Sequence, residues 1–195
     1  LKNIMGLWLV QECRREWQRA GEEHDYGEMV DMAAAAPAFG PVVSPEDSRF
    51  LAPGDMTPRI AAACRDAGQI PPASKGAFLR CALESLALEY RWVAERLDEL
   101  TGKRLETIHI IGGGAQNELL DQLAADATGR TVVTGPIEAT ALGNVLVQAK
   151  ALGHIGSMAE GREVVKASFD LKTFEPRDSA RWDDVYARYL EVRQS

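Results

Sequence analysis

The chain has 195 residues, enough for one domain with a sizeable hydrophobic core or for two small domains. With 46% hydrophobic and 26% charged residues, its composition is that of an ordinary globular protein. The formal net charge is −7 and no basic stripe is present, so we expect neither a nucleic-acid partner nor a membrane partner. The apolar run over residues 4–10 is too short to span a bilayer, and no signal-peptide cleavage site follows it.

The cysteines and histidines do not form a metal-binding pattern. Cys13, Cys64 and Cys81 lack CxxC spacing and the three histidines are scattered, so we predict no metal-binding residues. Such a sparse, odd set favours a reducing cytoplasm, with all three cysteines as small core residues. Because residue 1 is Leu and the chain opens inside an apparent helix, we expect it to be part of a longer protein.

The first third of the chain is predicted to be helical with one long loop. Residues 3–19 combine an apolar face with a basic face, which predicts an amphipathic helix. Residues 25–36 predict a second, shorter helix that ends before a proline. Residues 37–58 contain five prolines and should form an irregular loop. Thr57-Pro58, an N-cap followed by proline, predicts the start of a third helix that ends at Gly68.

The longest predicted helix covers residues 75–101, with Ser74 as its N-cap. Its apolar residues recur at alternating steps of three and four, which indicates a packing seam rather than a chemical role. The seam consists of Leu79, Leu83, Leu86, Tyr90, Val93, Leu97 and Leu100.

A strand, a glycine turn and a helix follow over residues 107–129. Ile108, Ile110 and Ile111 predict a short buried strand. The turn is Gly112, Gly113 and Gly114. Asn117 is a good N-cap for a helix that Gly129 ends. Free backbone N–H groups converge at such a turn, so it predicts a cradle for a nucleotide or phosphate.

The glycine turn does not match the common nucleotide motifs. The fingerprint G-x-G-x-x-G requires glycine at position 117, which is Asn, and no Gly-Lys-Ser/Thr follows as in a P-loop. Glu118 and Asp121 in the first helical turn would repel a phosphate placed on the helix end. The turn therefore suits the flat face or ribose edge of a nucleoside. A tight turn with no ligand fits this stretch equally well.

A second strand–helix unit follows. Residues 131–134 predict a strand and residues 138–152 a helix, so the sequence indicates an α/β domain. Ala139, Ala141, Gly143 and Ala149 make that helix small-sided, and we expect another element to pack closely on it. Further helices are predicted over residues 158–166 and 178–193, with a loop at residues 174–176 between them. The last helix should turn Trp182, Val185, Tyr186, Tyr189 and Leu190 inward.

Two sequence blocks carry a resemblance to a known family. Residues 110–117 (IIGGGAQN), continued by residues 119–126 (LLDQLAAD), resemble the second domain of FGGY carbohydrate kinases. Residues 135–144 (GPIEATALGN) are similar to the next block of the same family. The resemblance implies an actin-like ATPase (ribonuclease H-like) fold with a mixed sheet flanked by helices. It covers the chain as a partial C-terminal domain, residues 1–195, with the N-terminal sugar-binding and catalytic domain absent.

Residues 2–12 (KNIMGLWLVQE) and 50–56 (FLAPGDM) resemble one branch of the family, the rhamnulokinases. That resemblance implies a cytoplasmic kinase, acting in L-rhamnose catabolism, that transfers the γ-phosphate of ATP, with Mg²⁺, to O1 of L-rhamnulose. Carried over by motif, the ATP-binding residues would be Asn3, Gln11, Gly112, Gly113, Gly114 and Asn117. Asn3 and Gln11 are about two turns apart on the predicted first helix, so one face would present both.

The same resemblance implies that the other catalytic and substrate-binding parts lie outside this chain. A phosphate-binding turn, most of the sugar pocket and the catalytic base would belong to the missing N-terminal domain, so we predict no catalytic residue in this chain. The chain alone should be inactive, because phosphoryl transfer requires all of these parts together. The family can also carry a cysteine pair at the spacing of Cys64 and Cys81, which implies a possible bridge that cytoplasmic chemistry disfavours.

Three alternatives stay open at this point. The substrate can be another ketose, such as fuculose or xylulose, because the nucleotide blocks do not read the sugar. The chain can instead be an actin-like nucleotide-binding module without turnover. The hypothesis of an NAD-binding domain is weak, because the glycine spacing differs and Val133 is followed by Thr134 rather than by an acidic residue.

Overall fold

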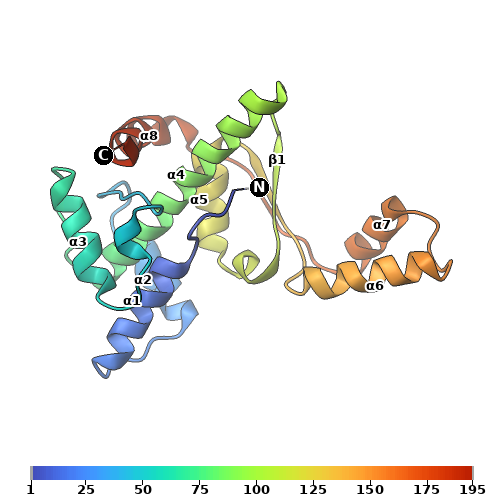
Figure 1. Ribbon diagram of the computed structural model, residues 1–195, viewed down its shortest axis with the longest axis horizontal. Helices are drawn as coiled ribbons and strands as arrows, with labels where there is room; N and C mark the ends of the chain where they lie inside the picture. Colours follow the sequence, from blue (N-terminus) through green and yellow to red (C-terminus); the bar gives the residue numbers. More distant parts are fainter. Residues whose placement is uncertain (1, 195) are drawn as a thin grey trace.

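Helices make up the first half of the chain, and strands enter only after the long helix α4 (Figure 1). The computed structural model describes residues 2–194. The first elements are α1 (Trp8–Arg19), α2 (Tyr26–Ala35), η1 (Ser48–Phe50), α3 (Met56–Asp66) and α4 (Lys75–Thr101). They are followed by β1 (Thr107–Ile110), η2 (Gly112–Gln116), α5 (Glu118–Thr128), β2 (Thr131–Thr134), α6 (Ala139–Ala151), α7 (Met158–Ser168), β3 (Thr173–Phe174) and α8 (Ser179–Gln194).

Local signals in the sequence explain where α2 and α4 begin. Asp25 caps α2 by accepting a hydrogen bond from the Glu28 N–H at 2.8 Å, and Glu28 accepts one from the Asp25 N–H at 3.1 Å. The Ser74 hydroxyl caps α4 by accepting from the Ala77 N–H at 3.2 Å. Both helices agree with their predicted bounds.

The first and third helices begin at other residues than predicted. The first starts at Trp8 rather than at residue 3, because Gly6 adopts a left-handed backbone with φ +59° that no helix contains. The segment before it is tied to a distant loop instead, through a Met5 N–H that donates to Glu46 Oε1 at 3.1 Å. The third starts at Met56, so that Pro58 lies in its first turn, where a missing N–H costs nothing.

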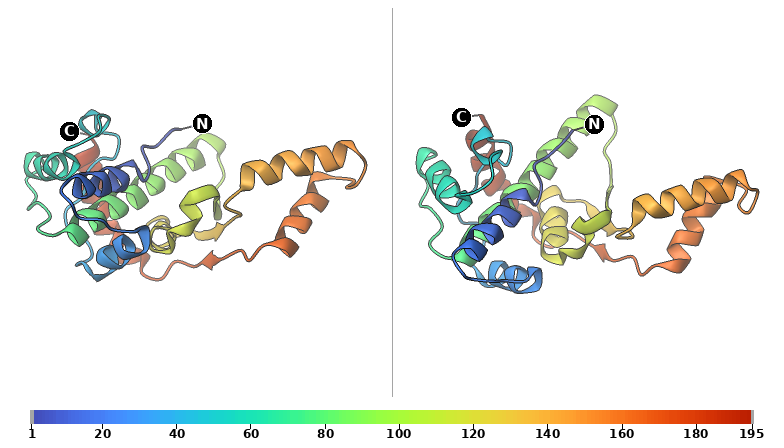
Figure 2. Two further views of the ribbon diagram at one scale, coloured as in Figure 1. Left: turned by 90° about the horizontal axis from the view of Figure 1, so that it is seen from below. Right: turned by 60° about the horizontal axis from the view of Figure 1, so that its bottom comes forward.

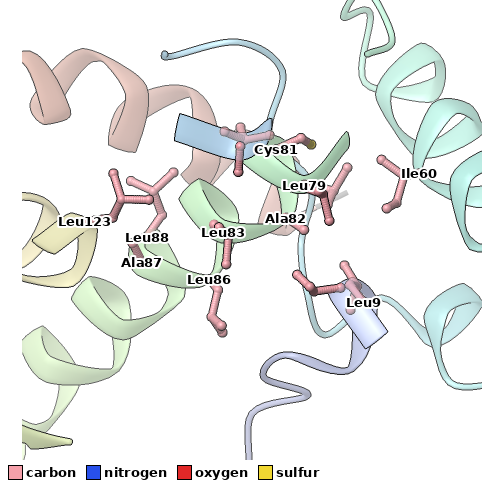
Figure 3. Close-up of a cluster of buried hydrophobic side chains, with 14 of the residues drawn as sticks. Leu9, Ile60, Leu79, Cys81, Ala82, Leu83, Leu86, Ala87, Leu88 and Leu123 are labelled. Atoms are coloured by element: carbon pink, nitrogen blue, oxygen red, sulfur yellow. The ribbon is translucent and has the colours of Figure 1, made fainter. Parts of the chain in front are cut away.

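The core is built around the first half of α4, which packs against α2 on one side and α5 on another (Figure 3). The core side chains of α4 include Leu79, Leu83, Leu86 and Leu88. The loop predicted over residues 37–58 is irregular only to residue 55, apart from the short helix η1, and before α3 it contributes the buried core residues Val42, Val43 and Phe50. The predicted seam fails at the far end of α4, where Leu97 is 41% and Leu100 82% exposed.

The sheet is small and mixed. β1 pairs with β2 in parallel, with Ile108 opposite Val132, and β2 pairs with β3 antiparallel, with Val132 opposite Phe174. α5 covers one face through Ala124 and Ala125. β3 was missed, because the sequence predicted a loop there. β1 is less buried than predicted: Ile111, directly after it, is 59% exposed.

The helices α6 and α7 lie away from the rest of the fold, which is called the body below. α6 and α7 form an arm, residues 137–169, that projects from the end of β2 in every view (Figures 1 and 2). No residue of α6 is buried, so the close neighbour predicted for its small side chains is not found among residues 2–194. α8 returns to the body and buries Trp182, Val185, Tyr186 and Tyr189 as predicted.

All three cysteines are free and buried, as small core residues. Burial raises the pKa of the Cys13 thiol to about 12. Cys64 and Cys81 do not form a disulfide, and the neighbouring Cys64 thiol together with burial raises the pKa of the Cys81 thiol. No helix within residues 2–194 has both the length and the apolar character needed to cross a bilayer.

Candidate nucleotide-binding site

A cavity of about 680 Å³ opens where α1, α2 and α4 meet the glycine turn η2. Its size lies within the range of small-molecule sites. α1 contributes Leu7, Val10 and Gln11; α2 contributes Tyr26, Gly27, Met29, Val30 and Asp31; α4 contributes Leu79 and Leu83; and the turn with the start of α5 contributes Gly113, Gly114, Gln116, Asn117 and Glu118. Segments more than eighty residues apart in the sequence therefore share one concave surface.

The glycine turn is held in place by the neighbouring strand. The Gly112 N–H donates to the Pro136 carbonyl at 3.2 Å, and the Gly135 N–H donates to the Ile110 carbonyl at 2.7 Å. Gly112 has φ +77°, which favours glycine because a Cβ there would be strained. These bonds fix the turn to the end of β2, so the backbone that follows is presented to the cavity in one orientation.

Gly113 and Gly114 present backbone rather than side chain to the cavity. A Cβ at Gly113 would meet no atom within 4 Å, so a larger residue there would extend into open space without striking the fold. Both glycines stand at the start of η2, where N–H groups have no partner within the turn. They are therefore available to a ligand that lies flat against the turn.

Amide side chains flank the glycines. Asn117 caps α5, its Oδ1 accepting from the Leu120 N–H at 3.0 Å, which leaves its NH₂ group for a ligand. Gln11 reaches the cavity from the middle of α1. On the opposite wall the ring of Tyr26 lies 4.8 Å from the Arg14 guanidinium carbon, a cation–π contact that steadies the ring.

The structure brings together four of the six residues predicted to bind ATP. Gln11, Gly113, Gly114 and Asn117 line the cavity. Gly112 does not line it, and its backbone anchors the turn instead. Asn3 is exposed in the segment before α1, so the argument that one helical face presents it together with Gln11 is wrong.

The two acidic residues of the first turn of α5 have different environments. Glu118 forms an ion pair with Lys172, which offsets its charge at the rim of the cavity. Asp121 is fully buried, and neither of its carboxylate oxygens has a hydrogen-bond partner. Desolvation, together with the charge of Glu118, raises the pKa of Asp121 to about 7. The repulsion of a phosphate predicted from the sequence is therefore weaker than two free carboxylates would produce.

No sequence pattern pointed to the α2 wall of the cavity. Tyr26 and Asp31 lie on a short helix whose pattern only marks an amphipathic element.

Known proteins resemble this chain in sequence and in fold. A sequence model of the FGGY family of carbohydrate kinases, C-terminal domain, matches residues 1–152. A rhamnulokinase of Bacteroides thetaiotaomicron is 42% identical over 189 residues, which are 97% of this chain and 38% of that protein. A rhamnulokinase of Oceanobacillus iheyensis is 41% identical over 89% of this chain and 36% of its own length.

Among solved structures, the glycerol kinase of Plasmodium falciparum with ADP superposes with a TM-score of 0.71 at 16% identity. The superposition covers 97% of this chain and 36% of that one. At this identity the likeness establishes the fold, an α/β domain of the actin-like ATPase type. The chain spans a little over a third of the length of the relatives it matches.

Proposed function

This chain belongs to the FGGY family of carbohydrate kinases, and we propose that it is the ATP-binding part of a kinase that phosphorylates L-rhamnulose at O1. The observation that carries the proposal is the cavity itself. Its lining combines the backbone of Gly113 and Gly114 with the amides of Gln11 and Asn117 and with apolar side chains of α4. Backbone and amide donors over an apolar floor suit a nucleoside.

Each wall of the cavity has a role in this proposal. Gly113 and Gly114 lie against the nucleoside, because no side chain separates their backbone from the ligand. Gln11 and the free NH₂ of Asn117 hydrogen-bond to its polar edges. Gly112 acts indirectly, by fixing the turn to Pro136. Asn3 can contribute only if the segment before α1 moves, so we place it outside the site.

ATP supplies the phosphoryl group that is transferred, and the catalytic base and most of the sugar pocket lie in the part of the kinase beyond this chain. Within residues 2–194 no three His, Cys, Asp or Glu side chains are grouped so as to hold a metal. Mg²⁺ commonly binds through nucleotide phosphates and water rather than through a protein cage, so this chain need not supply such a group. We accordingly expect this chain alone to bind nucleotide without turnover, in the cytoplasm.

Rhamnulose is favoured over other ketoses by two similarities. Relatives that share 41–42% of their residues with this chain carry the name rhamnulokinase. The two stretches that resemble that branch, residues 2–12 and 50–56, lie outside the shared nucleotide blocks. The substrate is to be tested on the full-length protein.

The first test is a calorimetric titration of the full-length protein with Mg-ADP, repeated with the Gly113→Val variant. We expect binding to the unmodified protein and a loss of at least about tenfold in affinity for Gly113→Val, because valine fills the cavity where a Cβ meets no protein atom. Gly40→Val is the matched control: a Cβ there also meets nothing within 4 Å, and Gly40 lies outside the cavity.

The second test is a phosphorylation assay of the same protein with L-rhamnulose, fuculose and xylulose. Preference for rhamnulose supports the full proposal. Preference for another ketose corrects the substrate and leaves the ATP-binding assignment intact. Equal loss of ADP binding in Gly113→Val and Gly40→Val would contradict the assignment of the glycine turn, since a general disturbance would then explain both.

A further inference from the structure

The charged residues that line the nucleotide cavity are both acidic. They are Asp31 on α2 and Glu118 at the start of α5, and the lining formed by residues 2–194 includes no Lys, Arg or His. Glu118 is paired with Lys172. The Asp31 carboxylate, by contrast, has no hydrogen bond and no ion pair within the described part of the chain. It is therefore an unused acceptor in the wall of the cavity.

The packing of α2 on α4 fixes Asp31 in this wall. Met29 and Ala33 of α2 are buried in the core and anchor the helix. Gly27 and Asp31 are one helical turn apart, and both line the cavity. A side chain on a helix leans over the turn that precedes it, so Asp31 extends toward Gly27. Because Gly27 has no side chain, the wall beside the carboxylate leaves room for a flat ring.

Charge determines which way a nucleotide enters the cavity. Phosphates favour free backbone N–H groups and cations, and both are found at the glycine turn, where Lys172 pairs with Glu118. The α2 wall repels phosphates, because the charged residue that it contributes to the lining is Asp31. The first turn of α2 is also already capped, by Asp25 and Glu28. The phosphate end of a nucleotide therefore belongs at the turn and its base at α2.

We propose that Asp31 determines specificity for the base, by accepting a hydrogen bond from the N6 amino group of adenine. This rests on the proposed function, because it takes the cavity to be the ATP site. A carboxylate only accepts hydrogen bonds, and the amino group only donates them. The amides of Gln11 and Asn117 supply donors for the ring nitrogens of adenine, which are acceptors.

Hypoxanthine, the base of inosine nucleotides, is the informative competitor. It carries a carbonyl oxygen where adenine carries the amino group, so two acceptors would face each other at Asp31. The site should therefore prefer adenine nucleotides to inosine nucleotides, since a polar group that is left without its partner costs binding free energy.

Calorimetric titration of the full-length protein with Mg-ADP and Mg-IDP tests the role of Asp31. We expect the parent to bind ADP at least about tenfold more tightly than IDP. Asparagine has the shape of aspartate, but its NH₂ group can donate to the hypoxanthine carbonyl. Asp31→Asn should therefore weaken ADP binding, strengthen IDP binding and reduce the preference to about twofold or less. Asp31 is exposed in the middle of α2, so the substitution should not disturb the fold.

Glu118→Gln is the matched control, because it neutralises the other carboxylate of the lining. It should change the affinities for ADP and IDP by the same factor, since its effect is on the phosphates that both share. An unchanged preference in Asp31→Asn would overturn the proposal. An equal loss of both nucleotides would also overturn it, and would place Asp31 at the ribose or at the phosphate-bound metal. Tighter binding of GDP than of ADP by the parent would contradict the assignment to N6, because a carboxylate can accept from two N–H groups of guanine.

The same titrations separate this proposal from the proposed function. If the parent binds neither ADP nor IDP, or if Gly113→Val binds ADP as tightly as the parent, the cavity is not the nucleotide site and both proposals fail. If Gly113→Val weakens ADP binding while the preference for ADP survives in Asp31→Asn, the nucleotide site stands and only the role of Asp31 is wrong.

Discussion

α4 and α6 are both helices with a high share of apolar residues, yet they have opposite surroundings. α4 buries twelve residues between its neighbours, whereas α6 buries none. The apolar pattern of a helix predicts which of its side chains are buried, and the structure shows which of them are buried in this chain. For α4 the two agree over its first half. For α6 they differ, because none of its apolar side chains is buried.

The largest expected effect contrasts one leucine from each helix region. Leu88→Ala in α4 should lower the free energy of unfolding by about 2–5 kcal/mol, because the side chain is fully buried and its removal leaves a cavity. Leu152→Ala at the end of α6 should change it by less than about 0.5 kcal/mol, since that side chain is 73% exposed. Urea unfolding of this chain measures both. Equal losses would mean that the arm is packed in solution.

Glycines give the second contrast. A Cβ at Gly76, in the first turn of α4, would lie 2.3 Å from the carbonyl oxygen of Met32 in α2. Gly76→Ala should therefore destabilise the body by about 1–3 kcal/mol, although alanine is the better helix former. In α6, a Cβ at Gly143 would meet no atom within 4 Å, so Gly143→Ala should raise the free energy of unfolding by up to about 1 kcal/mol.

Thermal unfolding followed by circular dichroism distinguishes these glycine variants. Opposite signs are expected, with a lower midpoint for Gly76→Ala and an unchanged or higher one for Gly143→Ala. A neutral Gly76→Ala would show that α2 can shift away from α4, and that the close approach is not needed for the fold.

Sequence reasoning succeeded where the cause is local. The caps that bound α4 and the cap at Asn117 follow from residues within one turn of each other. It failed where the cause is distant. β3 is too short to carry a pattern of its own and depends on β2, and Tyr26 reaches the cavity only through the packing of α2 on α4. The placement of Asn3 on the first helix was wrong for a local reason, the left-handed backbone of Gly6.

The buried carboxyl of Asp121 predicts how stability depends on pH. The ordinary pKa of an aspartate in the unfolded chain is 3.8, and burial raises it to about 7 in the folded state. Between these values the folded protein binds a proton at Asp121 that the unfolded chain does not, so the contribution of Asp121 to stability is greatest below about pH 4 and falls as pH rises to about 7. Asp121→Asn should remove this slope and be about 1–3 kcal/mol more stable than the parent above pH 7.

The measurement is a series of urea midpoints from pH 4.5 to pH 8. Glu163→Gln in α7 is the control from the arm, because Glu163 is exposed and only pairs with Lys166, so its pH profile should match that of the parent. An unchanged slope in Asp121→Asn would show that water or another group satisfies the Asp121 carboxylate.

The smallest expected effect concerns the ion pair that joins the cavity rim to the segment after the arm. Lys172 pairs with Glu118, and both side chains are more than half exposed, so Lys172→Gln should leave the unfolding midpoint nearly unchanged. It should weaken Mg-ADP binding by about twofold to fivefold, because Glu118 then repels the nucleotide phosphates without compensation. Added salt should shrink the difference by screening, and Glu118→Gln in the same molecule should restore the affinity. If Lys172→Gln weakens binding and the double variant stays weak, Lys172 contacts the nucleotide itself, and the segment that follows the arm belongs to the site.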